Sequence, residues 1–363
     1  VLRRERLVFT PQPHPVMDAS LVSSLEAEER EAYPEAESSP APPSLSGYLT
    51  ELESFLLRRV DVLEEDLRDV ARASLSRGGK RIRPALVHAC GTGTSVEPAN
   101  LVKVGAVVEF VHVATLVHDD VLDDATIRRG FQTLYASRGA TAAILLGDAL
   151  FAHALEMAAE FPRSDVCRLV SAATRRTCAG EIRQSFRRGD YLLDRAEYLR
   201  IIEAKTAELF RVSCLLGARL AGRDEATCGL AAETGRRLGV AYQLYDDLAD
   251  AFGREEDFGK TLGTDLAHGK VTLPVLTLFS HLEEAEAQRL LSSLRASSDE
   301  PPRETVEEIR DLLRTGDALD VCRSFLFAEL EATEGVLTEI ADEGMAERLD
   351  EIRLGFLRRV EDL

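Results

Sequence analysis

The sequence predicts an all-α fold, because helical periodicity with few helix breakers extends through most of its 363 residues. From about Leu49 onward, apolar residues recur at spacings of three and four, which places them on one face of a helix. Segments that alternate apolar and polar residues between turn signals, as half-buried strands do, are missing. Between Pro98 and Pro274 the only proline is Pro162, so long helices meet few interruptions. We therefore expect ten or more helices in one bundle-like domain.

The first 46 residues differ in composition from the remainder of the chain. They hold seven of the thirteen prolines and an acidic run from Glu26 to Glu37, without a sustained apolar period. Segments of this kind bury too little apolar surface to offset the entropy lost on ordering. We expect residues 1–46 to form a disordered N-terminal extension, in which Met17 is a candidate for the first translated residue. Residues 47–363 are expected to form the all-α domain.

Composition and charge argue against several classes of protein. The most apolar stretch, 142–159, is interrupted by Asp148, His153 and Glu156, so we expect no transmembrane helix and a cytoplasmic protein. A formal charge of −19, from 63 acidic and 44 basic residues, argues against binding of nucleic acid or anionic lipid. The six cysteines lack metal-ligand spacing, so we expect buried thiols in a reducing compartment and no zinc site.

An acidic motif occupies residues 119–124, at the end of an apolar helical run. Asp119 and Asp123 are four residues apart and share one face of a helix, where like charges repel. Mg²⁺ binds carboxylate oxygens together with water and phosphate oxygens, which would give such a pair a function. A solvated acidic helix end explains this motif as well, if the motif is taken alone.

A second acidic motif repeats the arrangement at Asp246, Asp247 and Asp250. Gly239 and Gln243 precede it at helical offsets, so that they line one face together with Asp246 and Asp250. Two such motifs within apolar helices are hard to ascribe to surface decoration. We expect two helices to present their carboxylates to a shared cluster of metal ions.

Basic residues gather around both acidic motifs, although the chain is acidic overall. They are Lys80, Arg81 and Arg83 beside a glycine pair, Arg128 and Arg129 after the first motif, Lys205, and Lys260 and Lys270 after the second motif. Arginine binds phosphate oxygens in a bidentate way, and lysine contributes a point charge. A single basic pair is usually part of a solvated surface. Several sets around two metal motifs predict two diphosphate pockets, one filled through metal and one filled directly by cations.

Beyond these motifs, the chain carries an ordered set of short segments: GGKRIRP (78–84), HDDVLDD (118–124), RRG (128–130), GDALFA (147–152), GEIRQ (180–184), KTAELF (205–210), YQLYDDLAD (242–250) and GTDLAHGKVTLP (263–274). In this order they resemble the trans-polyprenyl diphosphate synthases. The resemblance covers about residues 47–363 and is dense between residues 78 and 274. It implies an all-α bundle of the isoprenoid synthase type around a central cavity, usually as a homodimer.

The resemblance also assigns roles to individual residues. The principal ligands of Mg²⁺, up to three ions in all, correspond to Asp119, Asp123 and Asp246, and the supporting acidic residues to Asp120, Asp247 and Asp250. The isopentenyl diphosphate pocket corresponds to Lys80, Arg83, His112 and Arg129. The allylic diphosphate pocket corresponds to Arg128, Lys205, Thr206, Gln243, Lys260 and Lys270. The expected catalytic residues are Asp119, Asp123, Asp246, Lys205 and Arg128, and His118 is expected to be structural.

The implied reaction condenses isopentenyl diphosphate with an allylic diphosphate to give a trans-polyprenyl diphosphate. Loss of diphosphate leaves an allylic cation, which the double bond of isopentenyl diphosphate attacks before a proton is lost. Two alternatives are a class I terpene cyclase and a non-catalytic subunit of a heteromeric synthase. Cyclases usually lack the paired basic segments, and such subunits tend to lose an acidic motif, whereas both motifs are intact here.

Small residues stand where the family limits the length of its product. Ala114 and Thr115 precede Asp119 by about one turn, at positions where bulky aromatic residues favour short products. We expect a product longer than twenty carbons, such as a quinone side-chain precursor. A farnesyl or geranylgeranyl product is the alternative, because Phe151 or Met157 could close the cavity. The family commonly has proline at the position of Gln132, so the loop after residues 128–130 is expected to differ without affecting the metal ligands.

Overall fold

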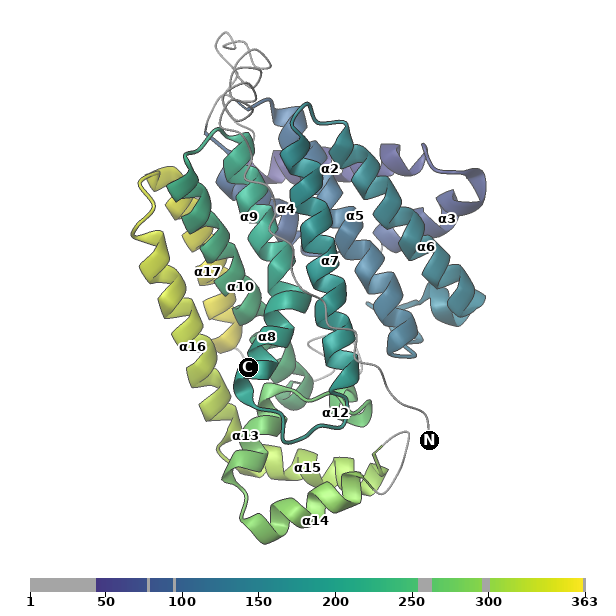
Figure 1. The fold of residues 1–363 in the computed structure, drawn as a ribbon, viewed down its shortest axis with the longest axis vertical. Helices are drawn as coiled ribbons and strands as arrows, with labels where there is room; N and C mark the ends of the chain where they lie inside the picture. Colours follow the sequence, from purple (N-terminus) through teal and green to yellow (C-terminus); the bar gives the residue numbers. More distant parts are fainter. Residues whose placement is uncertain (1–43, 77–78, 94–95, 254–262, 296–300, 362–363) are drawn as a thin grey trace, which may run out of the picture. The chain divides into compact units, whose positions relative to one another are not determined.

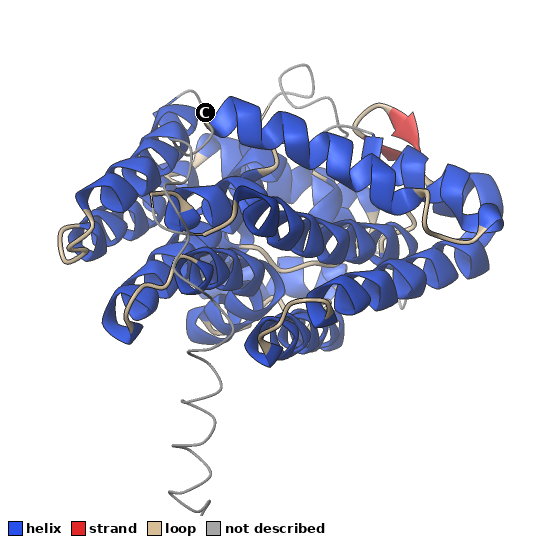
Figure 2. Cartoon of the chain, turned by 90° about the horizontal axis from the view of Figure 1, so that it is seen from above, coloured by secondary structure: helices blue, strands red, loops and turns tan. Residues whose placement is uncertain are grey.

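The fold is all-α, as expected from the helical periodicity. The computed structural model describes residues 44–76, 79–93, 96–253, 263–295 and 301–361. Within these ranges the only strands are β1 (Ile127–Arg128) and β2 (Phe131–Gln132), which form one antiparallel hairpin (Figure 2). Residues 1–43 and Lys260 lie outside the described residues, so the expected disorder of residues 1–46 stays a prediction.

The helices follow one another with short connections. In chain order they are α2 (Leu45–Val60), α3 (Glu65–Ser76), α4 (Ile82–Gly91), α5 (Pro98–Leu122), α6 (Leu134–Ala159), α7 (Ser164–Phe186), α8 (Arg195–Ile202), the π-helical turn η1 (Glu203–Ala207), α9 (Glu208–Leu220), α10 (Glu225–Phe252), α12 (Thr264–Ala267), α13 (Leu273–His281), α14 (Glu284–Leu294), α15 (Arg303–Thr315), α16 (Ala318–Leu337) and α17 (Glu343–Glu361). Five long helices pack side by side, each against the next in the order α5, α6, α7, α9 and α10 (Figure 1). Helix α5 contacts α9 as well.

Helix α5 lies in the core and carries the first acidic motif at its C-terminal end. It is apolar on every side, as expected for a helix buried among others. By length and composition alone, α5 and α6 are the two helices among the described residues that could cross a membrane. The apolar window of α5 is 72% buried and that of α6 is 44% buried, and a core helix of a folded domain passes the same test. The expected absence of a transmembrane segment stays a prediction.

Two glycines allow helices to approach the π-helical turn η1 closely. A Cβ atom added to Gly180 of α7 would lie 2.4 Å from the backbone nitrogen of Lys205. A Cβ atom added to Gly239 of α10 would lie 2.5 Å from the Cα atom of Ala207. Because real Cβ atoms do not approach so closely, only glycine allows α7 and α10 to pack on both sides of η1. This packing places η1 between the helices that carry the site.

The six cysteines are all free, and four of them are buried. The expectation of buried thiols is wrong for Cys178, which is exposed, and Cys167 is only partly buried. The buried stripe of α7 runs through Val170, Ala173, Thr177 and Gly180, and Cys178 falls beside it on the outward side. Helical position rather than residue type therefore decides its exposure.

Candidate active site

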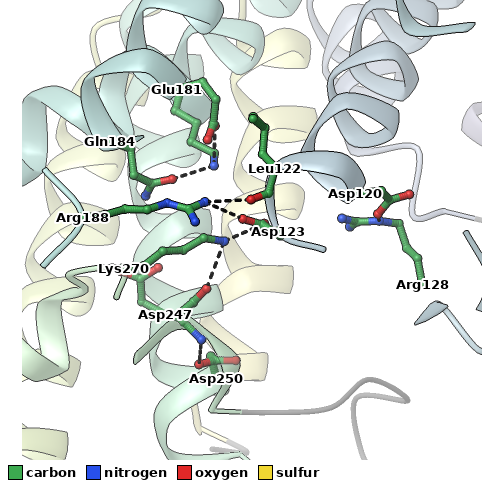
Figure 3. A network of polar contacts seen from close by, with 12 residues as sticks. Asp120, Leu122, Asp123, Arg128, Glu181, Gln184, Arg188, Asp247, Asp250 and Lys270 are labelled. Carbon is green, nitrogen blue, oxygen red and sulfur yellow. Dashed lines mark hydrogen bonds and ion pairs between the residues drawn. The ribbon is translucent and has the colours of Figure 1, made fainter. Parts of the chain in front are cut away.

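Helix α5 ends in the first acidic motif. Asp119 lies in its last turn, and Asp123 caps the helix, with its backbone N–H donating to the carbonyl of Asp119 at 2.9 Å. Two cations bind the Asp123 carboxylate: Lys270 Nζ lies 2.7 Å from Oδ2, and Arg188 Nη2 lies 2.9 Å from Oδ1 (Figure 3). Arg188 also donates to the carbonyl of Leu122 at 3.2 Å, at the negative end of the helix dipole.

The two carboxylates have different electrostatic surroundings. Burial raises the pKa of Asp119, and Glu181 raises it further, although Lys205 opposes both effects. Burial also raises the pKa of Asp123, but Lys270 and Lys205 outweigh burial, so that the pKa of Asp123 lies below its usual value. Burial therefore outweighs the neighbouring cations at Asp119, and a further cation beside it would favour the ionised carboxylate.

Lys205 reaches this cluster from the π-helical turn η1. Its Nζ lies 2.5 Å from Oε2 of Glu181 and donates to Oε1 of Gln184 at 2.7 Å, both on α7. Single π-helical turns inside α-helices are frequent at functional sites, because they redirect side chains that a regular helix would place elsewhere. The close approach at Gly180 brings the Lys205 backbone against α7 and so places its ammonium group near Asp119.

In the second acidic motif, Asp247 is a hydrogen-bond acceptor buried inside the bundle. Tyr198 Oη donates to Oδ2 at 2.6 Å, and Gln243 Nε2 donates to Oδ1 at 2.8 Å. The hydroxyl of Thr206 donates in turn to Oε1 of Gln243 at 2.7 Å, which links η1 to α10. Burial, with the nearby charge of Asp265, raises the pKa of Asp247 to about 7. This carboxylate therefore fastens α10 to its neighbours.

Asp250 fastens the chain that follows α10. Its carboxylate accepts hydrogen bonds from the backbone N–H of Gly263 at 3.0 Å and of Asp265 at 3.3 Å. The carbonyl of Asp265 accepts from the backbone N–H of Lys270 at 2.8 Å. These bonds hold the segment 263–270 against the end of α10, and Lys270 in this segment reaches Asp123 on α5. Asp246 is half-buried on the same helix, one turn before Asp250.

A second group of cations lies around His112. Burial, together with the charges of Arg83, Arg129 and Arg128, holds the pKa of His112 well below its usual value. The guanidinium of Arg83 stacks over the ring of Phe210 at 4.8 Å from the ring centroid. Three separate segments of the sequence supply Arg83, His112 and the pair Arg128–Arg129. The fold brings the three arginines together around the neutral imidazole of His112. This group of cations is therefore a candidate site for an anion.

The hairpin β1–β2 presents two of these arginines. Arg129 and Gly130 form its two-residue turn, with φ values of 52° and 77°, as a type I′ turn requires. Arg128 precedes the turn, and its Nε donates to Oδ1 of buried Asp120 at 2.6 Å. Gln132, which stands where the family commonly has proline, pairs with Ile127 in the hairpin.

Arg81 attaches the basic segment to the core of the bundle through hydrogen bonds. It caps α4 in the left-handed conformation, with φ 45°, and its side chain is buried. Its Nη1 donates to Oε1 of buried Glu109 at 2.5 Å, its Nε to Oε1 of Glu53 at 2.7 Å, and its Nη2 to the carbonyl of Leu75 at 2.8 Å. From the sequence, Arg81 is expected among the phosphate-binding cations. In the structure its side chain is buried in the core instead, whereas the neighbouring Lys80 is exposed.

Residues that sequence reasoning did not assign also belong to this site. Glu181 and Gln184 bind Lys205, and they stand in the segment GEIRQ, whose residues the sequence motifs give no individual role. Tyr198 binds Asp247, and Arg188 binds Asp123. These partners are separated by tens of residues along the chain, so no local spacing reveals them.

The predicted metal ligands are suited to an ion that shares its coordination with a substrate. Among the described residues, no three His, Cys, Asp or Glu side chains lie close enough to hold an ion by themselves. Mg²⁺ commonly binds one or two carboxylates and completes its shell with water and phosphate oxygens. Asp119 and Asp123 offer carboxylate oxygens, and cations that pair with phosphate oxygens lie beside them, so this donor set is compatible with Mg²⁺. Asp120, Asp247 and Asp250 are hydrogen-bonded within the protein, and their supporting role stays a prediction.

An all-α bundle with aspartates at two helix ends and cations beside them defines an enzyme of the isoprenoid synthase type. A family model described as polyprenyl synthetase matches residues 64–313. The chain belongs to the polyprenyl synthetase family and is a trans-prenyltransferase.

Several relatives resemble most of the chain. An octaprenyl diphosphate synthase of Haemophilus influenzae is 35% identical over 243 residues, which cover 67% of this chain and 73% of the relative. Component 2 of a heptaprenyl diphosphate synthase of Bacillus subtilis is 34% identical, with 74% of this chain and 78% of the relative covered. The crystal structure of a heptaprenyl diphosphate synthase from Staphylococcus aureus superposes with a TM-score of 0.79 and 28% identity, covering 87% of this chain and 98% of the other.

Proposed function

We propose that this prenyltransferase uses Mg²⁺ to condense isopentenyl diphosphate with an allylic diphosphate and releases a trans-polyprenyl diphosphate longer than twenty carbons. The observation that carries the proposal is the placement of two separate cation groups near the end of α5. Lys205 and Lys270 lie beside Asp119 and Asp123. Arg83 and Arg129 lie around His112, two turns earlier on the same helix. Two diphosphates need two such groups.

The allylic diphosphate is assigned to the side of Lys205 and Lys270. Mg²⁺ would be held there by Asp119, Asp123 and Asp246 together with the diphosphate. When bound, Mg²⁺ withdraws electron density from the diphosphate and so favours its departure. Lys205 and Lys270 neutralise the charge that develops on the leaving group, because their ammonium groups already lie at the carboxylates of the site. Thr206 and Gln243 support Lys205 through the bond between η1 and α10.

Isopentenyl diphosphate is assigned to the side of Arg83 and Arg129, with Lys80 at the exposed rim. Stacking on Phe210 fixes the plane of the Arg83 guanidinium, which favours bidentate binding of phosphate oxygens. His112 is neutral in these surroundings and offers a hydrogen bond without adding charge.

The reaction breaks the bond between the allylic carbon and the diphosphate oxygen, and the electron pair leaves with diphosphate. The double bond of isopentenyl diphosphate supplies the electrons of the new carbon–carbon bond. Loss of one proton then regenerates a double bond, and the departing diphosphate is proposed to accept that proton. The apolar residues of α5 before Asp119 exclude water from the cation.

The product is proposed to extend along α5 past Ala114. This residue is completely buried in an apolar cluster, and it contributes only a methyl group. Thr115 is half-buried, with its hydroxyl donating to the carbonyl of His112 at 2.7 Å. Phe151, partly buried against the same cluster, has its ring 5.6 Å from that of His118. The long products in the names of the relatives support the same proposal.

A product assay with the single purified chain tests the proposed function. The chain is incubated with isopentenyl diphosphate, a series of allylic primers and Mg²⁺, and the products are separated by chain length. We expect a ladder that ends beyond twenty carbons and disappears when Mg²⁺ is chelated. A cyclic hydrocarbon would favour a terpene cyclase, whereas activity only after a second chain is added would favour a subunit of a heteromeric synthase.

Ala114→Phe is expected to shorten the product, because an aromatic ring fills the path that the growing chain takes along α5. Ala114→Leu should give intermediate lengths, and Ala114→Ser should leave the length unchanged. Thermal melting identifies variants in which overpacking of the core, which costs about 1–3 kcal/mol, has altered the fold. An unchanged product distribution in a folded Ala114→Phe variant would remove Ala114 from the path.

The protein is proposed to act in the cytoplasm as a homodimer. Ile144 and Leu145 on α6 are 44% and 59% exposed, which leaves an apolar surface on that helix within the single chain. Covering such a surface with a second copy would remove it from water.

A further inference from the structure

We propose that Arg188 is a substrate-binding residue, whose guanidinium binds the allylic diphosphate beside Lys205 and Lys270. The inference rests on the proposed function and extends it to a residue with no role in the reasoning from sequence. Arg188 comes directly after Arg187, the residue that caps the C-terminal end of α7. It reaches the end of α5 without belonging to either acidic motif.

The backbone holds Arg188 and Lys270 next to each other. The N–H of Gly189 donates to the carbonyl of Gly269 at 2.8 Å, so the residue after Arg188 is bonded to the residue before Lys270. Both glycines have positive φ values, 74° and 68°, which L-residues rarely adopt. This bond therefore holds the two cations next to each other, although they come from segments far apart in the chain. They contact opposite oxygens of Asp123.

The number of cations at Asp123 exceeds what one carboxylate needs. Lys270 and Arg188 both contact this one carboxylate, at 2.7 Å and 2.9 Å. The Nε–H of Arg188 is buried and makes no hydrogen bond to any residue within the described ranges. A guanidinium with a donor left over, in a site that receives a diphosphate, can bind phosphate oxygens through its remaining N–H groups. If Asp123 held a metal ion as proposed, the like charge would repel the Arg188 guanidinium from Asp123 and would favour its contact with the diphosphate.

The alternative is that Arg188 has a purely structural role. A test must distinguish this role from binding of the allylic diphosphate. Arg188 donates to the carbonyl of Leu122 and to Asp123, and both contacts would stabilise the end of α5. A residue that only holds this helix end would change the melting temperature and would affect both substrates alike. A residue that binds the allylic diphosphate would affect that substrate selectively.

The neighbouring Arg187 provides a matched control. It carries the same charge, its side chain is 48% exposed, and it pairs with Asp190 at 3.5 Å and with Glu197 at 4.0 Å. None of these partners belongs to the acidic motifs. Arg187→Gln therefore removes one positive charge from the same segment without touching the site.

The experiment compares Arg188→Gln, Arg188→Lys and Arg187→Gln with the unaltered chain at saturating Mg²⁺. Michaelis constants are measured for farnesyl diphosphate and for isopentenyl diphosphate, together with melting temperatures. For Arg188→Gln we expect the Michaelis constant for farnesyl diphosphate to rise about tenfold or more, as loss of a charge-assisted hydrogen bond predicts. The constant for isopentenyl diphosphate should change less than about twofold. Arg188→Lys should lie between, and Arg187→Gln should match the unaltered chain.

Direct binding separates failure of this inference from failure of the proposed function. Calorimetry measures the affinity for inorganic diphosphate with Mg²⁺, which needs no turnover. Weaker binding by Arg188→Gln but not by Arg187→Gln supports the inference, even if the unaltered chain elongates none of the primers tried. Equal binding by all variants overturns it, as does a Michaelis constant that rises equally for both substrates.

Discussion

Asp119→Ala is expected to lower the rate of condensation by orders of magnitude while leaving the helical fold intact. The proposed metal ion would lose a ligand at the leaving diphosphate, where charge stabilisation contributes most to such a reaction. Burial raises the pKa of Asp119, so its ionised form costs stability once the pH exceeds the pKa of the unfolded chain. At neutral pH the variant should therefore melt no lower than the unaltered protein. Product formation and circular dichroism on the same sample check both expectations.

Asp124→Asn is the matched control for the lower rate of condensation expected of Asp119→Ala. Asp124 belongs to the same acidic motif, but it is exposed and accepts a hydrogen bond from the hydroxyl of Tyr135 at 2.5 Å. Its φ of 48° is one that asparagine tolerates, so the backbone should not change. Turnover within about twofold of the unaltered chain is expected, because one exposed charge contributes little. Near-normal turnover of Asp119→Ala would overturn the metal assignment.

Arg81→Met is expected to destabilise the protein by about 3–5 kcal/mol, since removing one partner of a buried ion pair leaves the other charge buried and unpaired. The partner is Glu109, which is 3% exposed on α5. Loss of Arg81 also removes the donor to the carbonyl of Leu75. Denaturant titration measures the change in the free energy of unfolding.

A double variant separates the charge from the packing. Arg81→Met with Glu109→Gln should recover much of the stability, because neither charge then remains buried. Arg58→Met should change stability by less than about 1 kcal/mol, since its pair with Glu51 is exposed on both sides. Equal effects of Arg81→Met and Arg58→Met would contradict the importance of burial at this pair.

The sequence predicted most of the fold because an amphipathic helix leaves a periodic signal and a buried helix leaves a long apolar run. The stretch before Asp119 illustrates this, since its apolar run became the core helix α5. The hairpin β1–β2 left no comparable signal, because each strand has two residues and period two needs a longer run. In the sequence, its turn, Arg129–Gly130, indicates only a basic motif.

For the site, helical spacing predicts which side chains share a face, but it does not predict how deeply each is buried. Asp246 and Asp247 are neighbours in the sequence, yet Asp247 turns inward to Tyr198 and Gln243. Contacts between distant segments are also invisible to local spacing. The pair of Arg188 with Asp123 is of this kind, and it depends on where α7 ends relative to α5.

The bond between Lys270 and Asp123 has a consequence for how the protein is made. The two residues are 147 positions apart, and the loop that carries Lys270 is fastened through Asp250. A chain still emerging from the ribosome can form α5 and α7 long before this lysine is synthesised. Until then the acidic end of α5 lacks one of its cations, so the growing chain holds an incomplete site. The proposed site is thus completed late in biosynthesis, only after Lys270 has been synthesised and has paired with Asp123.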